Sequence, residues 1–317
     1  MKVQTTRGSQ AARFSHAAGF FDAHTALIGQ LAPLATAAVG RDEPVAIGVR
    51  PITEEALRHL LGESVELVSL AQPDGLDPDS GQTVASRRAR QLRTLTEGGT
   101  RPITVLTEHI SQFDGADGGF WTELDAAMNI ALAELPIALT CFFPELPLHL
   151  AILDGARRNH EQLLVSGVPK DNPDYRPPRA VLAEQPVSAP AVLGPPDLTL
   201  RFSAWQLHEM RAQVQQALLA AGCQLEHAED VVLAVNEVAT NAVEHGQMEA
   251  ELMLWTGAEL VCEVHDRGIL GDPLPGLQAP HPADPKGRGI WIARQLCDVL
   301  HVWGDAAGTH VRMRTTR

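Results

Sequence analysis

The stretch that decides the fold of the C-terminal part is Val231-Val-Leu-Ala-Val-Asn-Glu-Val-Ala-Thr-Asn-Ala-Val-Glu-His-Gly246. Its apolar residues recur at helical spacing and form a stripe that we expect to face a core: Val231, Val235, Val238 and Ala242. Gly246 is a natural stop signal, because glycine readily adopts the left-handed conformation that ends many helices. The stretch therefore predicts one amphipathic helix packed into a domain core.

Three polar side chains project from one side of this predicted helix, beside the apolar stripe. Glu237, Asn241 and His245 are spaced four residues apart, so each lies about 6 Å further along the axis than the one before. Mg²⁺ prefers oxygen ligands and keeps several of its waters, so one amide oxygen beside a carboxylate could hold it next to a nucleophile. The alternative interpretation is a solvated helix face that is polar by chance.

Residues suited to a nucleotide base occur in two later turns of the chain. The predicted strand 260–265 ends in Asp266-Arg-Gly268. An acid at a strand end can accept a hydrogen bond from an exocyclic amine, and a glycine lets a flat base approach the backbone. Gly308-Thr309 opens the last strand, where the Thr309 hydroxyl could complete the polar group around the base. Taken singly, each turn would be an ordinary strand exit.

A third turn is suited to phosphate. Lys286-Gly287-Arg288-Gly289 precedes an apolar helix that begins near Ile290. Glycines free backbone N–H groups for an anion, a helix N-terminus attracts negative charge, and the two cationic side chains add to that attraction. A single Gly-x-Gly would be weak support, so the significance of this turn depends on its neighbours.

In this order, the four segments resemble the nucleotide-binding boxes of the GHKL superfamily of ATP-binding domains. The resemblance implies ATP and Mg²⁺ as cofactors, with Asn241 as the metal ligand, Glu237 as the general base and Asp266 as the adenine contact. It also implies that further residues line the pocket or contact phosphate: His245, Gly268, Lys286, Gly287, Arg288, Gly289 and Thr309.

Residues 198–317 look most like one branch of that superfamily, the anti-sigma-factor serine kinases of bacterial stress and sporulation switches. Two stretches carry this likeness, Asn236-Glu-Val-Ala-Thr-Asn-Ala-Val-Glu-His-Gly246 and Gly287-Arg-Gly-Ile-Trp-Ile-Ala-Arg-Gln-Leu-Cys-Asp298. The resemblance implies a serine/threonine protein kinase whose partners are a sigma factor, an anti-sigma-factor antagonist, or both. Such kinases are often dimers, so a homodimer is open.

Two other functions remain as alternatives. The proline-rich segment 269–285 takes the place of the ATP lid, and its prolines prevent the helix found in many lids. A non-catalytic adaptor, in which ATP only tunes protein binding, would tolerate that change. A sensor histidine kinase is less favoured, because neither His208-Glu209 nor His160-Glu161 is followed by the proline of a phospho-acceptor helix.

The chain of 317 residues is long enough for two domains, divided by the proline-rich segment 167–197, which we expect to be an extended linker without regular structure. Residues 198–317 predict an α/β sandwich with helices on one face of an antiparallel or mixed sheet. Residues 1–166 predict a mainly parallel α/β domain. Its β-rich runs are 44–49, 65–70, 103–107 and 137–142, and its helix-like stretches include 20–39 and 149–164.

The N-terminal domain resembles the sensory domain named after methanogens and methylotrophs. Four stretches carry the resemblance: Glu43-Pro-Val-Ala-Ile-Gly-Val49, Thr107-Glu-His109, Leu139-Thr-Cys-Phe-Phe-Pro144 and Ala156-Arg-Arg-Asn-His160. It implies an unknown small-molecule or protein signal. Ligands of open α/β sheets bind at the carboxyl ends of strands, which makes Arg50, Glu108, His109 and Cys141 pocket candidates; core packing and surface charge are the alternative.

Composition restricts the partners. A net charge of −14 and a pI of about 5.3 argue against a nucleic-acid or anionic-membrane surface, which needs clustered Lys and Arg. The most apolar run, 126–143, is too short and too polar to cross a bilayer, so we expect a soluble, cytoplasmic protein. The four cysteines form no C-x-x-C pair and are expected to be reduced thiols rather than metal ligands or disulfides.

Overall fold

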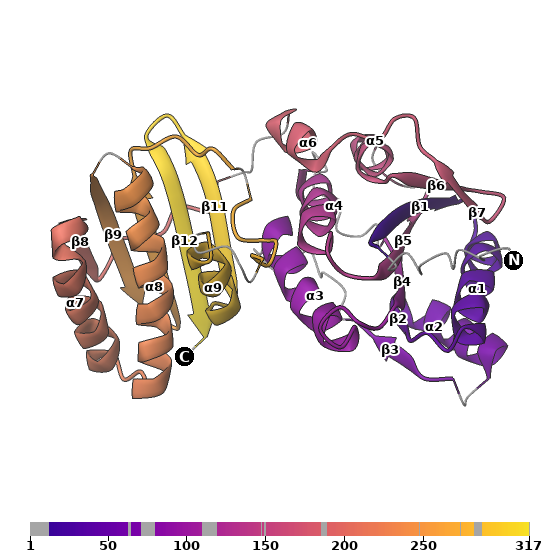
Figure 1. The fold of residues 1–317 in the computed structure, drawn as a ribbon, viewed down its shortest axis with the longest axis horizontal. Helices are drawn as coiled ribbons and strands as arrows, with labels where there is room; N and C mark the ends of the chain where they lie inside the picture. Colours follow the sequence, from indigo (N-terminus) through magenta and orange to yellow (C-terminus); the bar gives the residue numbers. More distant parts are fainter. Residues whose placement is uncertain are drawn as a thin grey trace, which may run out of the picture.

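A computed structural model describes residues 13–62, 65–70, 80–109, 119–146, 148, 150–184, 189–246, 248–272, 274–281 and 287–316. The described residues form two sheets, one from each half of the chain, each with its own helices (Figure 1). Within the described part of the chain, no helix combines the length and apolar character needed to cross a membrane.

The N-terminal half is a seven-stranded sheet in the order β3-β2-β4-β5-β1-β6-β7, parallel except for the last pair. The strands are β1 Ser15–Phe21, β2 Val45–Gly48, β3 Leu67–Ser69, β4 Ile103–Glu108, β5 Ile137–Pro144, β6 Gln162–Val165 and β7 Val168–Asp171. The helices are α1 His24–Gly40, α2 Pro51–Leu61, α3 Gly81–Leu95, α4 Gly119–Ala131, α5 Leu150–Asn159 and α6 Pro178–Glu184.

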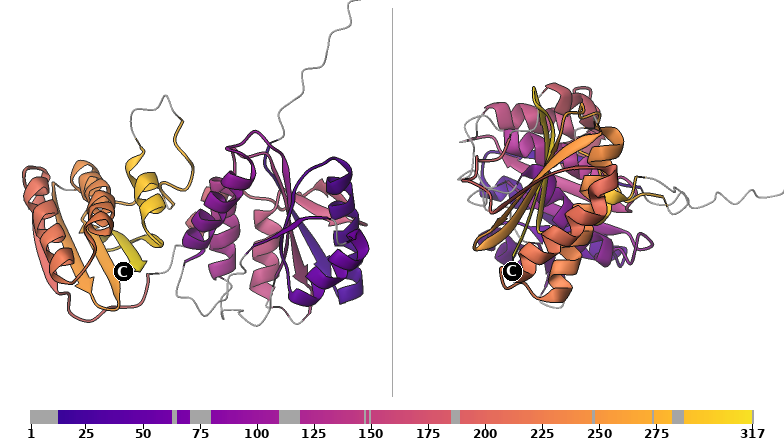
Figure 2. Two further views of the ribbon diagram at one scale, coloured as in Figure 1. Left: turned by 90° about the horizontal axis from the view of Figure 1, so that it is seen from below. Right: turned by 90° about the vertical axis from the view of Figure 1, so that its left-hand side faces the viewer.

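Helices cover both faces of this sheet, as a parallel sheet requires. Residues of α1 and α2 share one core cluster, with Leu27 and Leu57 fully buried. Residues of α3 to α6 share the core cluster of the other face. Figure 2 shows the two helical layers on either side of the strands. The predicted mainly parallel α/β architecture of this half is confirmed.

Three strands of this sheet were not predicted from the sequence. β1 carries small residues such as Ala17 and Ala18 in place of the β-branched residues that mark a strand, yet it lies in the middle of the sheet between β5 and β6. Tertiary pairing overrides weak strand propensity there. The helix predicted from residue 20 therefore begins only at His24, and the one predicted over 149–164 ends at Asn159, where β6 follows.

The proline-rich segment 167–197 contains regular structure, so the prediction that it has none is wrong. It includes β7 and α6. Pro169 is tolerated because β7 is an edge strand, and Pro178 is tolerated because it is the first residue of α6. The division of the chain into domains at this segment stays a prediction.

The C-terminal half is a five-stranded antiparallel sheet in the order β11-β12-β10-β9-β8, with its helices on one face (Figure 1). The strands are β8 Leu198–Ser203, β9 Glu249–Thr256, β10 Glu259–Asp266, β11 Val299–Asp305 and β12 Gly308–Thr316. The helices are α7 Leu207–Ala220, α8 Leu225–His245 and α9 Gly289–Leu296, preceded by the 3₁₀ turn Ala204–Gln206. The predicted α/β sandwich is confirmed, and the predicted apolar stripe of α8 is buried.

The two halves meet where α3 lies along β11, the edge strand of the second sheet. The Gln82 side chain acts there like a further strand residue. Its Nε2 donates to the carbonyl of Val302 at 3.2 Å, and its Oε1 accepts from the N–H of Val302 at 3.2 Å. Arg87 and Arg90 extend the contact by donating to the carbonyls of Asp298 and Gln295. The exposed edge of the sheet is thereby covered.

Arg294 of α9 is the centre of this contact and is almost fully buried. Its guanidinium donates to the carbonyls of Pro275 and Leu300, each at 2.9 Å, and to Gln82 Oε1 at 2.7 Å. Burial lowers the pKa of Arg294 to about 10, so the group remains a cation at neutral pH. Leu274 and Leu277, which flank Pro275, are buried in the core cluster shared by α3 and α4.

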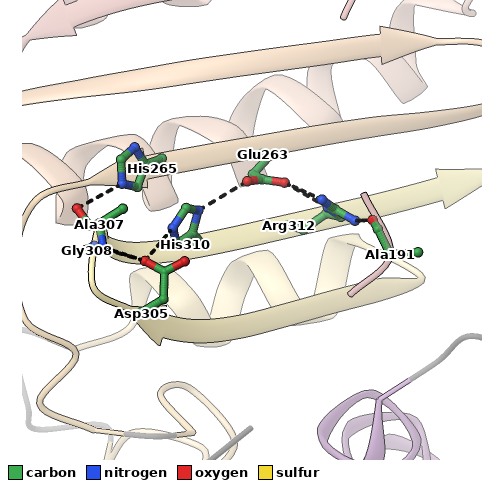
Figure 3. A network of polar contacts seen from close by, with 8 residues as sticks. All are labelled: Ala191, Glu263, His265, Asp305, Ala307, Gly308, His310 and Arg312. Atoms are coloured by element: carbon green, nitrogen blue, oxygen red, sulfur yellow. Dashed lines mark hydrogen bonds and ion pairs between the residues drawn. The ribbon is translucent and has the colours of Figure 1, made fainter. Parts of the chain in front are cut away.

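The opposite face of the second sheet carries a polar network (Figure 3). Arg312 of β12 donates to Glu263 of β10 and to the carbonyl of Ala191. His310 lies 3.2 Å from Glu263 Oε1 and 3.4 Å from Asp305 Oδ1. Burial works against the charged imidazole, but these two carboxylates outweigh it and raise the pKa of His310 above its ordinary value of 6.5.

Replacing Gln82 with Ala should weaken the contact between the two halves. The substitution leaves the main-chain groups of Val302 and one Arg294 N–H without their partner, and each buried polar group so treated costs about 1–3 kcal/mol. We expect a lower free energy of unfolding and faster hydrogen exchange at the Val302 amide. Gln91→Ala, at an exposed position of the same helix, is the control. Equal exchange in the two variants would contradict the assignment.

The His310 network should make stability depend on pH. Because the folded-state pKa is raised, the stabilisation is complete below the unfolded-state pKa of about 6.5 and is lost as the pH rises through the folded-state value. The difference in unfolding free energy between the wild type and His310→Gln should therefore be largest below the ordinary histidine pKa of about 6.5 and shrink as the pH rises above it. Urea titrations at several pH values measure it. A difference that grows with pH would refute this account.

Candidate nucleotide-binding site

A cavity of ≈ 380 Å³ lies between the C-terminal half of α8, the ends of β10 and β12, and the start of α9. Most of the predicted site residues line it, namely Asn241, His245, Asp266, Gly268, Gly287 and Thr309. The segment that follows β10 closes one side with Asp272, Pro275 and Gly276. Chain segments that are far apart in sequence thus meet around one space, as the sequence predicts.

The predicted polar row of α8 meets the glycine turn at Gly289. A Cβ atom placed on Gly289 would lie 2.8 Å from Glu237 Oε2 and 3.1 Å from Asn241 Nδ2. Both side chains therefore point at the first residue of α9, and a methyl group there would have to displace their ends. If α8 were rotated about its axis, the polar row would face solvent instead of Gly289. The chemical roles of Glu237 and Asn241 stay predictions.

Asp266 lies at the other end of the cavity, where β10 ends, and is mostly buried. Its Oδ1 accepts from the N–H of Gly268 at 2.6 Å, which fixes the carboxylate against the turn. Thr309 pairs with Asp266 across the β10–β12 ladder and donates its hydroxyl to the carbonyl of Gly268 at 3.2 Å. Burial raises the pKa of the Asp266 carboxyl. A half-shielded acceptor of this kind suits an exocyclic amine.

Two more glycines are required by close approach to Asp266. A Cβ on Gly308 would overlap the Asp266 carbonyl oxygen, and Gly308 has a φ of +143°, which L side chains rarely adopt. A Cβ on Gly246 would lie 2.8 Å from Asp266 Oδ1. Helix α8 ends before Gly246 as predicted, but the φ there is −82°, so the left-handed ending inferred from the sequence is wrong. A Cβ there would also overlap the carbonyl oxygen of Ala242, so the close approach of that oxygen and of Asp266 is the reason for the glycine.

The end of the cavity at which the sequence predicts phosphate is formed by the residues just before α9. Gly287 lines the cavity with a φ of +83°, and Arg288 is exposed and donates to the carbonyl of His281 at 3.3 Å. Gly287 and Ile290, on either side of the first residue of α9, line the cavity, so the N-terminus of this helix adjoins it, and a helix N-terminus favours an anion. Lys286 lies outside the described residues. His245 lines the cavity and is exposed to solvent.

The apolar walls of the cavity were not predicted from the sequence; they include Val238, Ala242, Val264, Ile290, Val302 and Val311. The signal was present in the strands. Val264 lies two residues from Asp266 on β10, and Val311 lies two residues from Thr309 on β12. Residues two apart in a strand share a face, so each of these apolar residues lies on the same face as a predicted polar one. Apolar walls with a few convergent polar groups are typical of small-molecule sites.

Of the pocket candidates in the N-terminal half, three line a second, smaller cavity of ≈ 60 Å³: Glu108, His109 and Cys141. Arg50 is placed differently. It caps the start of α2 and makes an ion pair with the buried carboxylate of Glu108. That ion pair gives Arg50 a structural role beside the cavity. Among the cysteines, Cys223, Cys262 and Cys297 are buried and Cys141 is partly exposed.

Comparison with known proteins agrees with this geometry. Residues 201–315 match the family described as histidine kinase-like ATPase domain. No curated protein matches the chain. Among solved structures, the chain is similar to the RsbU and RsbW domains of Rv1364c from Mycobacterium tuberculosis, with 20% identity and a TM-score of 0.28. That match covers 41% of this chain and 34% of the other, so it spans about a third of that chain's length.

The family match includes every residue of the cavity described above, from Val238 to Val311. The helices α7, α8 and α9 and the four glycine-bordered segments also lie within the matched residues. Residues 201–315 thus match the histidine kinase-like ATPase domain family in sequence, and the α/β sandwich they form is consistent with the GHKL type.

Proposed function

We propose that the C-terminal domain binds Mg-ATP and acts as an anti-sigma factor with serine/threonine kinase activity toward an anti-sigma-factor antagonist, under control of the N-terminal domain. The observation that carries this proposal is the meeting of Glu237 and Asn241 at Gly289, with Asn241 lining the same cavity as Asp266. The close sequence likeness of 236–246 and 287–298 to the serine-kinase pattern selects this branch of the superfamily.

The residues present fit a magnesium nucleotide. Asn241 supplies an amide oxygen for the metal, Asp266 an acceptor for the adenine amine, and the start of α9 offers N–H groups to phosphate. Gly289 and Gly308 occupy positions that a Cβ would fill. When bound, the metal would neutralise charge on the triphosphate.

Glu237 is the candidate general base. Its carboxylate lies beside the start of α9, which is the end of the cavity assigned to phosphate. There it would accept the proton of a serine hydroxyl presented by the partner protein. Orientation of that hydroxyl and shielding by the apolar walls are the contributions this chain makes to transfer.

Control by the N-terminal half is supported by what holds the segment after β10. Arg179 of α6 makes a 2.7 Å ion pair with Asp272, and Gln278 donates to Glu134 at 3.0 Å. Arg294 binds Pro275 from the same helix whose first residue contacts Glu237. A movement of the N-terminal helices would therefore shift both one wall of the cavity and its phosphate end.

One observation favours the adaptor alternative. The described residues of 269–281 contain no helix, as their prolines predict, so the usual helical lid is replaced by an extended segment. For the histidine-kinase alternative, His160 is fully buried, while His208 is exposed on α7. Of these two histidines, only His208 could accept a phosphoryl group without unfolding of its surroundings.

A labelling experiment separates the three functions. The full-length protein is incubated with Mg-ATP labelled at the γ-phosphate and with candidate antagonist proteins. Acid-stable label on a serine of the antagonist supports the kinase. Nucleotide binding without any label leaves the adaptor, and acid-labile label on the protein itself, lost in His208→Ala, identifies a histidine kinase.

Asn241 and Glu237 should separate binding from transfer. Asn241→Ala should remove measurable Mg-ATP binding, because the protein ligand of the metal is lost. Glu237→Gln should bind Mg-ATP almost as the wild type does, while phosphoryl transfer falls by about 10²–10⁴-fold. Calorimetry and the labelling assay measure the two quantities. Unchanged Mg-ATP affinity in Asn241→Ala would overturn the metal assignment.

Gly289→Ala tests the geometry rather than the chemistry. The added methyl group must displace Glu237 Oε2 and Asn241 Nδ2, so Mg-ATP affinity should fall about tenfold or more. Gly257→Ala is the matched control, since a Cβ there meets nothing within 4 Å. If both variants bind Mg-ATP like the wild type, the contact at Gly289 has no part in the site.

A further inference from the structure

Four potential metal ligands converge in the N-terminal half, outside the nucleotide site. They are His16 of β1, Asp125 of α4, Cys141 of β5 and His160, which follows α5. One ligand atom from each lies within 4.8 Å of the others. His16 and His160 are fully buried, and their rings are 3.9 Å apart. Two imidazoles, a thiol and a carboxyl from four separate parts of the fold thus lie close together.

Hydrogen bonds fix both imidazoles in the tautomer that a metal requires. His160 Nδ1 lies 2.6 Å from the carbonyl of Ala156, which can only accept, so Nδ1 carries the proton. His16 Nδ1 lies 2.9 Å from Asn129 Oδ1, and the Asn129 amide is oriented by donating to the carbonyl of Asn159. Each Nε2 therefore presents a lone pair. This is the outer-shell arrangement that orients metal-bound histidines.

The lone pair of His160 is the unexplained group. Its Nε2 is buried and has no hydrogen-bond partner among the residues that the structure describes. A buried polar atom left without a partner is destabilising. A cation that accepts the lone pair would resolve the deficit without protonating the ring.

We propose that His16, Cys141, His160 and Asp125 form a binding site for a divalent transition metal of the zinc class. Two nitrogens, one sulfur and one oxygen are a donor set typical of tetrahedral zinc and unsuited to Mg²⁺ or Ca²⁺. Metal binding replaces the thiol proton of Cys141 and the proton of the Asp125 carboxyl, and both are released to solvent. The expectation from sequence that no cysteine is a metal ligand is revised for this residue.

The distances are compatible with such a site. A tetrahedral zinc centre separates its ligand atoms by about 3.3–3.8 Å, given bond lengths of about 2.0–2.3 Å. His16 Nε2 already lies 3.3 Å from Cys141 Sγ. All four ligand atoms lie within 4.8 Å of one another, so no pair has to approach by more than about 1.5 Å to reach tetrahedral spacing. The cavity of ≈ 60 Å³ that includes His16, Asp125 and Cys141 in its lining leaves room for a small ligand beside the metal.

The site lies one helix away from the contact between the two halves. Asp125 is on α4, two residues from Glu123, whose Oε1 accepts from the N–H of Gln82 at 3.0 Å. Gln82 in turn binds Arg294 and β11. Metal occupancy would be transmitted to the ATPase domain along this route, although metal binding itself is independent of the proposed kinase function.

The test uses the full-length chain, freed of metal and titrated with Co²⁺ as an optical probe without nucleotide. One Co²⁺ per chain should bind with the visible absorption of a tetrahedral centre and a thiolate-to-cobalt charge-transfer band, and Zn²⁺ should displace it. Cys141→Ser should lose the charge-transfer band, and Asp125→Asn should bind about 10–100-fold more weakly. Cys223→Ser is the matched control and should retain the spectrum.

A second readout needs no variant, in case Cys141→Ser fails to fold. Alkylation of the wild type, followed by mass spectrometry, should modify Cys141 in metal-free protein at least tenfold faster than in protein loaded with Zn²⁺. The proposal is overturned by the absence of tetrahedral Co²⁺ absorption in the wild type. It is also overturned by a charge-transfer band that survives in Cys141→Ser, or by equal alkylation with and without Zn²⁺.

Discussion

The buried guanidinium of Arg294 is the interaction on which the arrangement of the two halves depends. A cation removed from water must have its donors satisfied, and three separate segments do this: the strand β11, the segment after β10 and the helix α3. Removing any one of them would leave a buried charge partly unsolvated. The position of α9, and with it Gly289, is therefore set by residues from both halves of the chain.

The nucleotide site depends on a simpler constraint, the rigidity of one helix. Glu237, Asn241 and His245 keep their spacing because α8 is anchored by its buried apolar stripe. Glycines then allow the backbone of α9 and of the β10 and β12 ends to approach this face. A site built this way loses function through small steric additions at glycine positions, and through chemical changes at only a few side chains.

The sequence was informative where local pattern and final structure agree. Helical periodicity predicts α8, and the order of four motifs predicts which segments surround the cavity. It failed where long-range pairing decides, as in β1, whose small residues become a central strand only between β5 and β6. It also failed where a residue type has several uses: Gly246 ends the helix but is glycine because the Ala242 carbonyl oxygen and Asp266 lie against it. The group of His16, Asp125, Cys141 and His160 could not be predicted because its members come from four elements that are far apart in sequence.

The central position of β1 has a consequence for how the chain is made. Ser15 pairs with Ala138, so the first strand leaves the ribosome long before its neighbour exists. Contacts of such high sequence separation form slowly, and an unpaired apolar strand invites association with other chains. The N-terminal half should thus be the part of the newborn polypeptide that most needs a chaperone. In the antiparallel C-terminal sheet, the paired residues furthest apart in sequence are Glu259 and Thr316, much closer than Ser15 and Ala138, so this sheet can assemble sooner after it emerges.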